Sequence, residues 1–590
     1  MFNSEGGLQA NVEVTLKVLG ISNAIDSGAC LVVDGLIVDA VNEERFNRKK
    51  QTRDFPFQSI EWILQKNGLR LSDIDVFGTG AWNGVAQPET LLALVNEARD
   101  LSIRQGHYVI ERIRERIEAS VTSSAKGKRE LFTGLKSLGV PEEKVIFCDH
   151  HRAHALTAFS PSPFEESLVL VADGRGDFSS LTLWAGSRRI KGHVSILDTI
   201  SELTSVGAMY GFITNLLGFT PHKHEGKVTG LASRGKPTKF LKALREVLYF
   251  DKSSGKIVCT YGDYYQPFIS AKPIGLQSML LDVAIEDAAF AAQTVLEEII
   301  KGYLSFHITR LGIEKTNLCL SGGIFANVKL NHELLKVSGV GQLFVAPMMG
   351  DGGMALGGAI YATLSAPQTQ DITPLRDVYL GPEYSRKEYL EILETTDLPW
   401  RELTNQEKIE LACNLLAEGK IVGWFQDRME YGPRALGNRS ILANPVLPNI
   451  NEILNKRLNR SEFMPFAPVT TDDLAPKIFK DWDSQNLTSQ FMTSCFEVTE
   501  TMTRLCPNVV HVDNTARPQV ISREKNSQYY DVVARFIEKT GVPALINTSF
   551  NHHEEPIVMS PRDAINSFLK GNVDALFLGD FLIINHSTPD

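Results

Sequence analysis

A unit of strand, acidic turn and strand occurs twice in the first half of this chain, about 150 residues apart. The first copy has β-rich runs at 14–22, 29–33 and 36–41, with Asp34-Gly35 between the last two. The second has runs at 167–172, 180–185 and 190–197, and its first turn is Asp173-Gly-Arg-Gly-Asp177. Asp-Gly between β-rich runs is a good hairpin signal. The repeat therefore predicts an internal duplication.

Helical patterns alternate with these strands, as in an α/β protein. Apolar spacing predicts a helix at 57–67, two or three helices within 89–138 and a long helix at 281–311. Near residue 365 the composition changes, because the stretch 365–374 is polar and contains prolines. Beyond it the pattern predicts a new helix at 406–418 and a strand at 421–425. Since 590 residues exceed one ordinary core, we expect two domains, 1–368 and 369–590.

Composition narrows the functional class. Hydrophobic residues at 43% and charged residues at 22% are typical of a soluble globular protein. No apolar run is long enough to span a membrane and no secretory signal precedes the first strand, so we expect a cytoplasmic protein without a membrane partner. The seven cysteines are scattered, which argues against a disulfide framework or a structural zinc site.

The net charge of −10 argues against nucleic acid as a partner, because neutralising phosphates needs clustered Lys and Arg. The basic stretch Arg45–Lys50 is an exception, and composition alone favours a solvated loop there.

Four loops rich in Asp and Gly are candidates for phosphate binding: Asp26-Ser-Gly28, Asp173–Asp177, Ser321-Gly-Gly323 and Gly350-Asp-Gly-Gly353. Such loops let backbone N–H groups approach phosphate, while a carboxylate recruits a metal. Each alone is more often an ordinary turn. Together they favour nucleotide binding, and they resemble the superfamily of actin, sugar kinases and heat-shock chaperones, whose two ribonuclease-H-like halves close over a nucleotide.

A candidate metal site begins at Asp149-His-His-Arg-Ala-His-Ala155. His150 and His154 are four residues apart, so on a helix both imidazoles project from one face. The spacing alone is weak, since a cluster of histidines that caps a helix would look the same. Asp173 and Asp351 could complete the shell from the glycine loops, and imidazoles with carboxylates suit iron or zinc better than magnesium.

From about Val18 to Ile584 the chain resembles the nodulation-factor and antibiotic O-carbamoyltransferases. The resemblance rests on a set of motifs, of which the stretch from Gly423 to Leu442 is the most specific. The others are Glu43–Lys50 with Phe55-Pro56, His150–Ala155, Asp173–Asp177, Tyr210 with Leu217–Phe219, Glu225–Ala232, Ser321–Gly323 with Asn327, Pro347–Gly353, Pro465–Pro468, His511–Gln519 and Asn547–Asn551.

The resemblance implies a fold and a division of labour. A duplicated ribonuclease-H-like N-terminal domain would hold a metal and transfer the carbamoyl group, and a smaller α/β YrdC-like C-terminal domain would make carbamoyl-adenylate. The substrates would be ATP with Mg²⁺ and carbamoyl phosphate, the metal Fe²⁺, and the acceptor a hydroxyl of a small natural product, as in antibiotic biosynthesis. A homodimer is allowed, although the oligomeric state does not follow from the sequence.

The family motifs also assign residues. The catalytic set is Lys50, Arg434 and Arg517, and the metal ligands are His150, His154, Asp173 and Asp351. The residues expected to bind nucleotide or donor are Gly174, Gly176, Glu225, Lys227, Gly322, Gly323, Asn327, Gly352, Asn547 and Ser549. Bidentate guanidinium groups suit planar anions, and Lys50 would add a point charge. Lys227 has a plainer alternative, which is to brace its loop.

Several positions depart from the family pattern. Ile25 replaces a histidine that is a natural candidate for a base near the acceptor hydroxyl. Leu458 and Met464 stand where a lysine and an arginine are usual, although Lys456, Arg457 and Arg460 are near enough to compensate. Asp427 and Glu554 replace glycines and would add negative charge near an anion site. Two alternatives therefore stay open: an adenylating enzyme with another donor, and a catalytically silent homologue that binds nucleotide.

Overall fold

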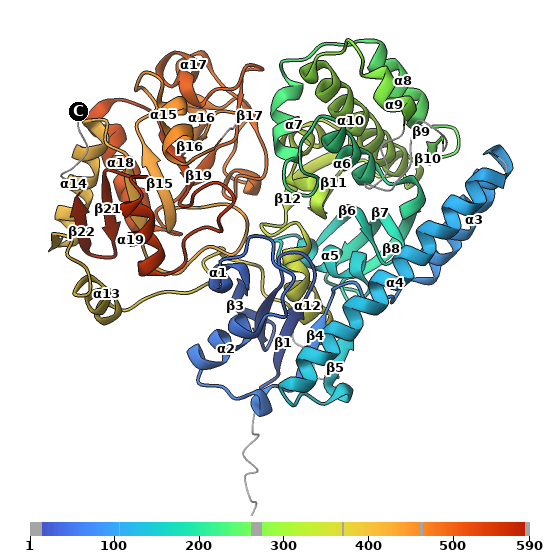
Figure 1. The fold of residues 1–590 in the computed structure, drawn as a ribbon, viewed down its shortest axis with the longest axis horizontal. Coiled ribbons are helices and arrows are strands. Elements are labelled where there is room, and N and C mark those ends of the chain that lie inside the picture. Colours follow the sequence, from blue (N-terminus) through green and yellow to red (C-terminus); the bar gives the residue numbers. More distant parts are fainter. Residues whose placement is uncertain (1–14, 106, 261–273, 368–370, 461–463, 585–590) are drawn as a thin grey trace, which may run out of the picture.

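The computed structural model describes residues 15–105, 107–260, 274–367, 371–460 and 464–584. Two five-stranded sheets and one eight-stranded sheet organise the chain, which is mixed α/β (Figure 1). The first sheet has the order β3-β2-β1-β4-β5. Its strands are β1 (Lys17–Ser22), β2 (Gly28–Val33), β3 (Leu36–Asn42), β4 (Val76–Thr79) and β5 (Val145–Phe147).

The second sheet repeats this arrangement. Its strands are β6 (Glu166–Gly176), β7 (Ser179–Ser187), β8 (Val194–Ser201), β11 (Thr316–Ser321) and β12 (Val340–Val345). In each sheet the first three strands in sequence pair antiparallel, and the fourth and fifth extend the sheet in parallel from the first. The two sheets therefore share one strand order and one set of directions.

The turn predicted at Asp173–Asp177 is misplaced. Strand β6 continues through Asp173 and Gly174, and the reversal occurs at Asp177 and Phe178, whose φ angles are +44° and +74°. A two-residue hairpin loop needs positive φ at both positions to match the twist of its strands. Asp173 consequently lies on the strand, at an irregularity in its pairing with β7.

Two helices, α5 (His150–Phe159) and α12 (Met354–Ser365), pack against each other and against the two sheets: α5 on β6 and β11, α12 on β1 and β4. The approach of α12 to β1 is very close, because a Cβ on Gly20 would lie 1.9 Å from the carbonyl oxygen of Ala355. This packing brings the beginning of α5 and the loop before α12 to the same place in the fold.

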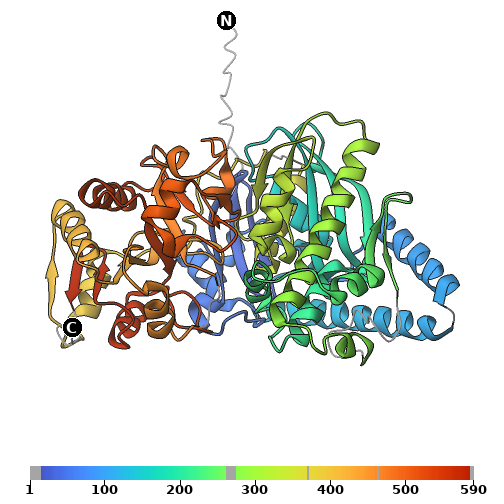
Figure 2. The same ribbon diagram turned by 90° about the horizontal axis from the view of Figure 1, so that it is seen from above.

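The other helices of this half pack on the sheets or on one another. They are α1 (Glu44–Asn47), α2 (Phe57–Lys66), α3 (Pro88–Gln105), α4 (His107–Ser137), α6 (Val206–Leu216), α7 (Glu225–Ala232), α8 (Lys239–Val247), α9 (Ile274–Met279), α10 (Ile285–Arg310) and α11 (Val328–Leu335). Helix α2 packs on β2 and α6 on β6, whereas α7 and α8 pack on α10. The predicted helices at 57–67 and 281–311 correspond to α2 and α10, and the charged stretch 89–138 forms α3 and α4, which project from the body (Figures 1 and 2).

Beyond residue 371 the eight-stranded sheet has the order β13-β22-β21-β14-β15-β20-β16-β19. These strands are β13 (Trp400–Glu402), β14 (Val422–Phe425), β15 (Arg439–Ala443), β16 (Ala467–Thr471), β19 (Gln519–Ile521), β20 (Leu545–Ser549), β21 (Ala575–Leu578) and β22 (Phe581–Ile584). Two-stranded pairs are β9 (Leu248–Asp251) with β10 (Lys256–Cys259), and β17 (Phe496–Glu497) with β18 (Thr515–Ala516).

Helices pack on both faces of this sheet over separate apolar clusters. On one face α14 (Asn405–Ala417) packs against α18 (Ser527–Thr540). The remaining helices of this half are α13 (Arg386–Leu393), α15 (Ile450–Arg457), α16 (Ala475–Ile478), α17 (Glu500–Leu505) and α19 (Pro561–Leu569). Among the described residues, no helix combines the length and apolar character needed to cross a bilayer.

Arginines from the N-terminal half join the two halves. Arg45 is buried and donates to the carbonyl of Gly432 (3.0 Å), and Arg48 donates to the carbonyls of Pro556 and Ile557 (2.7 and 2.8 Å). The solvated-loop interpretation of this basic stretch is therefore wrong for both arginines. Composition could not reveal their partners, because those partners are backbone carbonyls about 390 to 510 residues away.

Candidate functional site

The beginning of α5 places two histidines. The side chain of Asp149 accepts a hydrogen bond from the backbone N–H of Arg152 (2.8 Å) and caps the helix. Such a cap contributes about 1 kcal/mol to helix stability. It makes His150 the first helical residue and puts His154 one turn further on, on the same face. The predicted helical spacing is therefore present.

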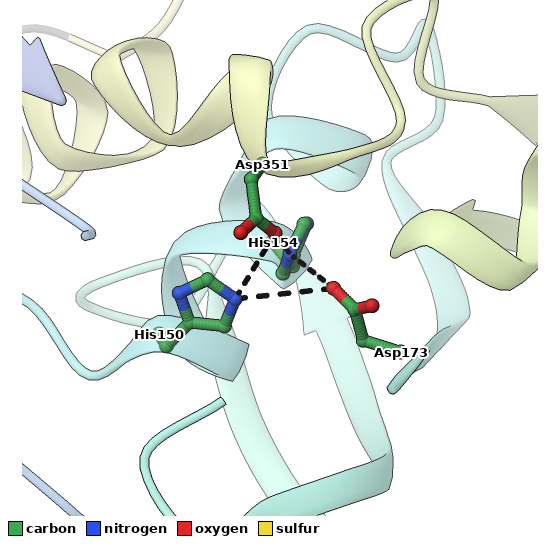
Figure 3. Close-up of side chains that lie close together, drawn as sticks. All are labelled: His150, His154, Asp173 and Asp351. Carbon is green, nitrogen blue, oxygen red and sulfur yellow. Dashed lines mark ion pairs between the residues drawn. The ribbon is translucent and has the colours of Figure 1, made fainter. Parts of the chain in front are cut away.

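Four side chains converge at this point (Figure 3). The Nε2 atom of His154 lies 3.3 Å from a carboxylate oxygen of Asp173 and 3.5 Å from one of Asp351. The Nε2 atom of His150 lies 3.9 Å and 3.5 Å from the same two oxygens. Asp173 comes from β6, and Asp351 begins the 3-10 turn η5 (Asp351–Gly353) before α12. Four candidate ligand atoms from three separate elements thus lie within 4.8 Å of one another.

Hydrogen bonds decide which nitrogen of each imidazole faces this centre. Nδ1 of His150 contacts the carbonyl oxygen of Gly80 (3.1 Å), so it must carry the proton. Nδ1 of His154 contacts the hydroxyl of Ser321 (3.0 Å), which itself donates to the carbonyl of Met349, so this Nδ1 also carries the proton. Nε2 is therefore the nitrogen that each imidazole turns toward the centre, and its lone pair is available to a metal once the metal displaces any proton there.

Both Nε2 atoms are fully buried and have no well-aligned hydrogen-bond partner within the described part of the chain. Buried polar atoms are seldom left this way. Two imidazole nitrogens with two carboxylates form a donor set suited to a first-row transition metal. The residues present therefore fit a divalent metal.

Within the cluster, His150 and the two aspartates shift one another's pKa values. Burial by itself would lower the pKa of His150, but the carboxylates of Asp351 and Asp173 outweigh burial and hold that pKa well above its ordinary value. Burial would likewise raise the pKa of Asp173 and of Asp351, but the two imidazoles hold both below their ordinary values. Both aspartates are therefore anionic and ready to hold a cation.

The predicted glycines of the N-terminal half surround this cluster. A Cβ on Gly176 would lie 2.0 Å from the ring of His150, so only glycine lets β6 pass the imidazole. Gly174 donates its N–H to Asp173 (2.6 Å), and Gly323 is adjacent to the same carboxylate. Gly322 has a φ of +103°, and Gly352 follows Asp351. Their observed contacts are with the ligand-bearing segments.

A cavity of about 610 Å³ lies between the two halves of the chain. It brings together seven of the predicted site residues, namely Lys50, Lys227, Asn327, Arg434, Arg517, Asn547 and Ser549. Glu225 is not among its lining residues, and its carboxylate instead accepts the backbone N–H of His222 (2.6 Å). None of the four clustered histidines and aspartates lines the cavity, so the two sites are separate.

The cavity is strongly cationic. Its described lining includes seven Lys or Arg side chains and only three carboxylates. The sequence motifs give no role to Lys223 or Lys329, and they suggest Arg460 only as a compensating cation. Of these three, only Arg460 had a sequence signal, the nearby family motif. The excess of positive charge favours a polyanionic ligand.

A buried carboxylate shapes the loop that carries Arg434. Glu430 accepts hydrogen bonds from the backbone N–H groups of Leu436 and Asn438 (2.7 Å each) and of Arg439 (3.2 Å). Three donors on one oxygen close the loop into a fixed bend. Asn547 supports the same bend from β20, since its amide donates to the carbonyl of Ala435 (3.1 Å).

The positions that depart from the family pattern fall in different places. Leu458 is fully buried in an apolar cluster, whereas Arg460 lines the cavity and donates to Asn551 (2.8 Å). Met464 also lines the cavity and approaches Gly230. Glu554 lies at the lining beside Lys223, but Asp427 does not line the cavity.

Family models match both halves of the chain. A model described as carbamoyltransferase N-terminus matches residues 17–360, and one described as carbamoyltransferase C-terminus matches residues 413–585. The chain therefore belongs to the carbamoyltransferase family, and it is an enzyme of the carbamoyltransferase class.

Particular relatives extend over nearly the whole chain. Nodulation protein NolNO of Sinorhizobium fredii is 34% identical over 95% of this chain and 78% of its own length. MJ1051 of Methanocaldococcus jannaschii is 32% identical over 96% and 99%, and sll1178 of Synechocystis is 30% identical over 97% and 97%. Among solved structures, HypF of T. kodakarensis aligns at 12% identity with a TM-score of 0.32 over 59% of this chain and 48% of its own. An overlap this weak does not define the fold.

Proposed function

We propose that this enzyme makes carbamoyl-adenylate from carbamoyl phosphate and ATP and passes the carbamoyl group to a hydroxyl of a small natural product. The cationic cavity between the halves is the observation that carries the proposal, because both substrates are polyanions. Seven cations in one cavity suit a triphosphate together with a second phosphate compound.

The residues that line the cavity would have different chemical roles. Arg434 and Arg517 would grip donor and nucleotide phosphates through bidentate hydrogen bonds, with Asn547 and Ser549 beside them. Lys50 and Lys227 would add point charges from the N-terminal half, and Asn327 would orient the nucleotide. Mg²⁺ would accompany ATP. A cavity enclosed between the two halves of the chain would also exclude water and so protect the adenylate from hydrolysis.

The cluster of His150, His154, Asp173 and Asp351 would hold a divalent metal, with iron favoured over magnesium by the two imidazoles. When bound, the metal would supply Lewis-acid polarisation of the carbamoyl carbonyl or the nucleotide. Gly174, Gly176, Gly322, Gly323 and Gly352 keep the surrounding backbone close to this site.

We assign the two steps to two domains, 1–368 and 369–590. The matching strand orders of the first two sheets support a duplicated ribonuclease-H-like domain, which would carry out transfer. The eight-stranded mixed sheet supports a YrdC-like domain for adenylation. A small natural product as acceptor rests on the resemblance to the nodulation-factor and antibiotic carbamoyltransferases, and two of the relatives carry the name nodulation protein. A cytoplasmic enzyme without a nucleic-acid or membrane partner fits the acidic composition.

A second candidate is an enzyme of this fold that activates another acid. Glu554 favours it, because this carboxylate lies in the cavity where the family has glycine and would oppose a phosphate nearby. Its pairing with Lys223 (3.2 Å) reduces that opposition, so carbamoyl phosphate remains the preferred donor.

Pyrophosphate release from ATP by the purified protein, with and without carbamoyl phosphate, tests the proposal. We expect release that depends on carbamoyl phosphate and falls at least about 100-fold in Arg434→Gln, whereas Arg386→Gln, a surface arginine paired with Glu402, is unaffected. Release with another acid alone would support the second candidate, and no release under any condition would contradict both and favour a silent homologue.

A further inference from the structure

Four side chains form a continuous chain along one wall of the cavity. Lys329 on α11 lies 3.2 Å from one carboxylate oxygen of Asp513. The other oxygen lies 3.3 Å from Nδ1 of His511, and Nε2 of His511 lies 3.2 Å from the hydroxyl of Ser233, which follows α7. All four side chains line the cavity. Two halves of the protein therefore build one Ser–His–Asp arrangement that the function described so far does not use.

The contacts of His511 bear on which of its two ring nitrogens can carry a proton. Nδ1 of His511 faces a carboxylate, so it carries a proton. The hydroxyl of Ser233 donates to the carbonyl of Gly230 (3.1 Å) and lies where it would accept from a protonated Nε2. The four side chains therefore accommodate an imidazolium with every contact satisfied. If Nε2 loses its proton, the hydroxyl of Ser233 can turn and donate to it.

Asp513 stays ionised in this setting. Burial by itself would raise its pKa, but hydrogen bonds from His511 and Thr515 and the charge of Lys329 outweigh burial and hold the pKa well below its ordinary value. The charged groups that contact this set of side chains are Asp513, on the same loop as His511, and Lys329 on α11. The end of α7 contributes the hydroxyl of Ser233 and a backbone carbonyl.

The proposed adenylation requires a proton donor at this stage. Pyrophosphate leaves ATP only when a free carbamate oxygen attacks the α-phosphorus, so carbamoyl phosphate must first be split into carbamate and phosphate. Where the carbon–oxygen bond breaks, phosphate would depart as a trianion, which is a strong base and a poor leaving group. A general acid beside that oxygen removes the obstacle.

We propose that His511 and Ser233 together form the general acid that releases phosphate from carbamoyl phosphate, with Asp513 as the positioning residue; this rests on the proposed function. Water oxygen bonds to the carbamoyl carbon while the carbon–oxygen bond to phosphate breaks. The Nε2 proton of His511 passes through the hydroxyl of Ser233 to the departing oxygen, which leaves as HPO₄²⁻. One proton shed by water returns to His511, the second is released to solvent, and carbamate remains for adenylation.

Phosphate release from carbamoyl phosphate, measured without ATP and corrected for the enzyme-free reaction, tests this step alone. We expect His511→Gln to lower kcat about 100-fold or more, with KM changed less than about threefold, because the acid acts in the transition state. Wild-type kcat should have an alkaline limb in its pH profile, and that limb should vanish in His511→Gln. Ser233→Ala should lower kcat about tenfold or more. His332→Gln, a half-buried histidine of α11 outside the cavity lining, is the matched control and should behave as wild type.

The same reaction in ¹⁸O-water locates the broken bond. We expect the label in carbamate and carbon dioxide and none in phosphate. Label in phosphate would overturn the proposal, as would a His511→Gln variant that keeps the alkaline limb, or a wild type that releases no phosphate. Phosphate release without pyrophosphate release in the presence of ATP would support the general acid and overturn adenylation alone.

Discussion

The phenolic oxygen of Tyr431 lies 2.7 Å from the carbonyl oxygen of Gly352 and donates a hydrogen bond to it. Tyr431 precedes the loop that carries Arg434, and Gly352 follows Asp351 of the candidate metal site. Both groups are buried. One hydrogen bond therefore connects the cationic cavity with the histidine–aspartate cluster, which otherwise share no lining residue.

Removing this hydrogen bond should affect the metal site more than the cavity. In Tyr431→Phe the carbonyl of Gly352 keeps only the longer contact from Asn42 (3.3 Å), so the turn that holds Asp351 loses support. We expect metal affinity, measured by calorimetric titration of the metal-free protein, to fall about tenfold. Carbamoyl-phosphate-dependent pyrophosphate release should stay within about twofold of wild type. A reversed pattern would mean that the contact serves the cavity instead.

Gly176 should be intolerant of a side chain. A Cβ there would lie 2.0 Å from the ring of His150, so Gly176→Ala should displace the imidazole and lower metal affinity at least about 100-fold. Gly174→Ala is the matched control on the same strand, because its Cβ would meet no atom within 4 Å. Equal losses of metal affinity in both variants would show that the strand itself, and not the space beside His150, is what matters.

Substitutions in the two sites should separate the two half-reactions. Arg517→Ala should abolish carbamoyl-adenylate formation, because it removes a cavity cation expected to bind phosphate. His154→Ala should still form the adenylate but should not transfer the carbamoyl group, because it removes one of the four candidate ligands. Pyrophosphate release and carbamoylated product, measured in parallel, check this. If His154→Ala loses both steps equally, the division of labour is wrong.

Restoring glycine at position 554 should improve donor binding. Glu554 lines the cavity and has a φ of +62°, so Glu554→Gly removes a negative charge and relieves about 1 kcal/mol of backbone strain. We expect a KM for carbamoyl phosphate lower by about threefold or more. Asp427→Gly is the matched control, since Asp427 also has a positive φ of +37° but does not line the cavity. An unchanged KM in Glu554→Gly, with activity towards another acid lost, would favour the other donor.

Glu430 should be required for the shape of the Arg434 loop. Glu430→Ala would leave three buried N–H groups without their acceptor, at a cost of about 1–3 kcal/mol for each group that water cannot reach. We expect a lower midpoint of thermal unfolding and a loss of pyrophosphate release. Glu430→Gln keeps an acceptor oxygen in place and should recover most of both, whereas equal damage in the two variants would mean that the charge itself is needed.

Local patterns in the sequence anticipated many elements well. The hairpins, the helix at 57–67 and the spacing of His150 and His154 depend on neighbours within a few residues, so they were readable. The turn predicted at Asp173–Asp177 is misplaced because β6 and β7 pair again at Gly176 and Ser179, beyond an irregularity in the ladder, and the reversal therefore falls at Asp177 and Phe178. Composition favours a solvated loop for Arg45 and Arg48 because it carries no mark of the distant backbone carbonyls to which both arginines donate.

The sequence by itself determined the α/β class, the family and the residue types available for chemistry, because motifs and periodicity are properties of contiguous segments. Only the tertiary structure decided which of those residues meet. Asp351 joins His154 because α12 packs against α5, and Ser233 meets His511, 278 residues away, because the two halves close on one cavity. Contacts of this kind arise from the packing of whole elements, and no local pattern records them.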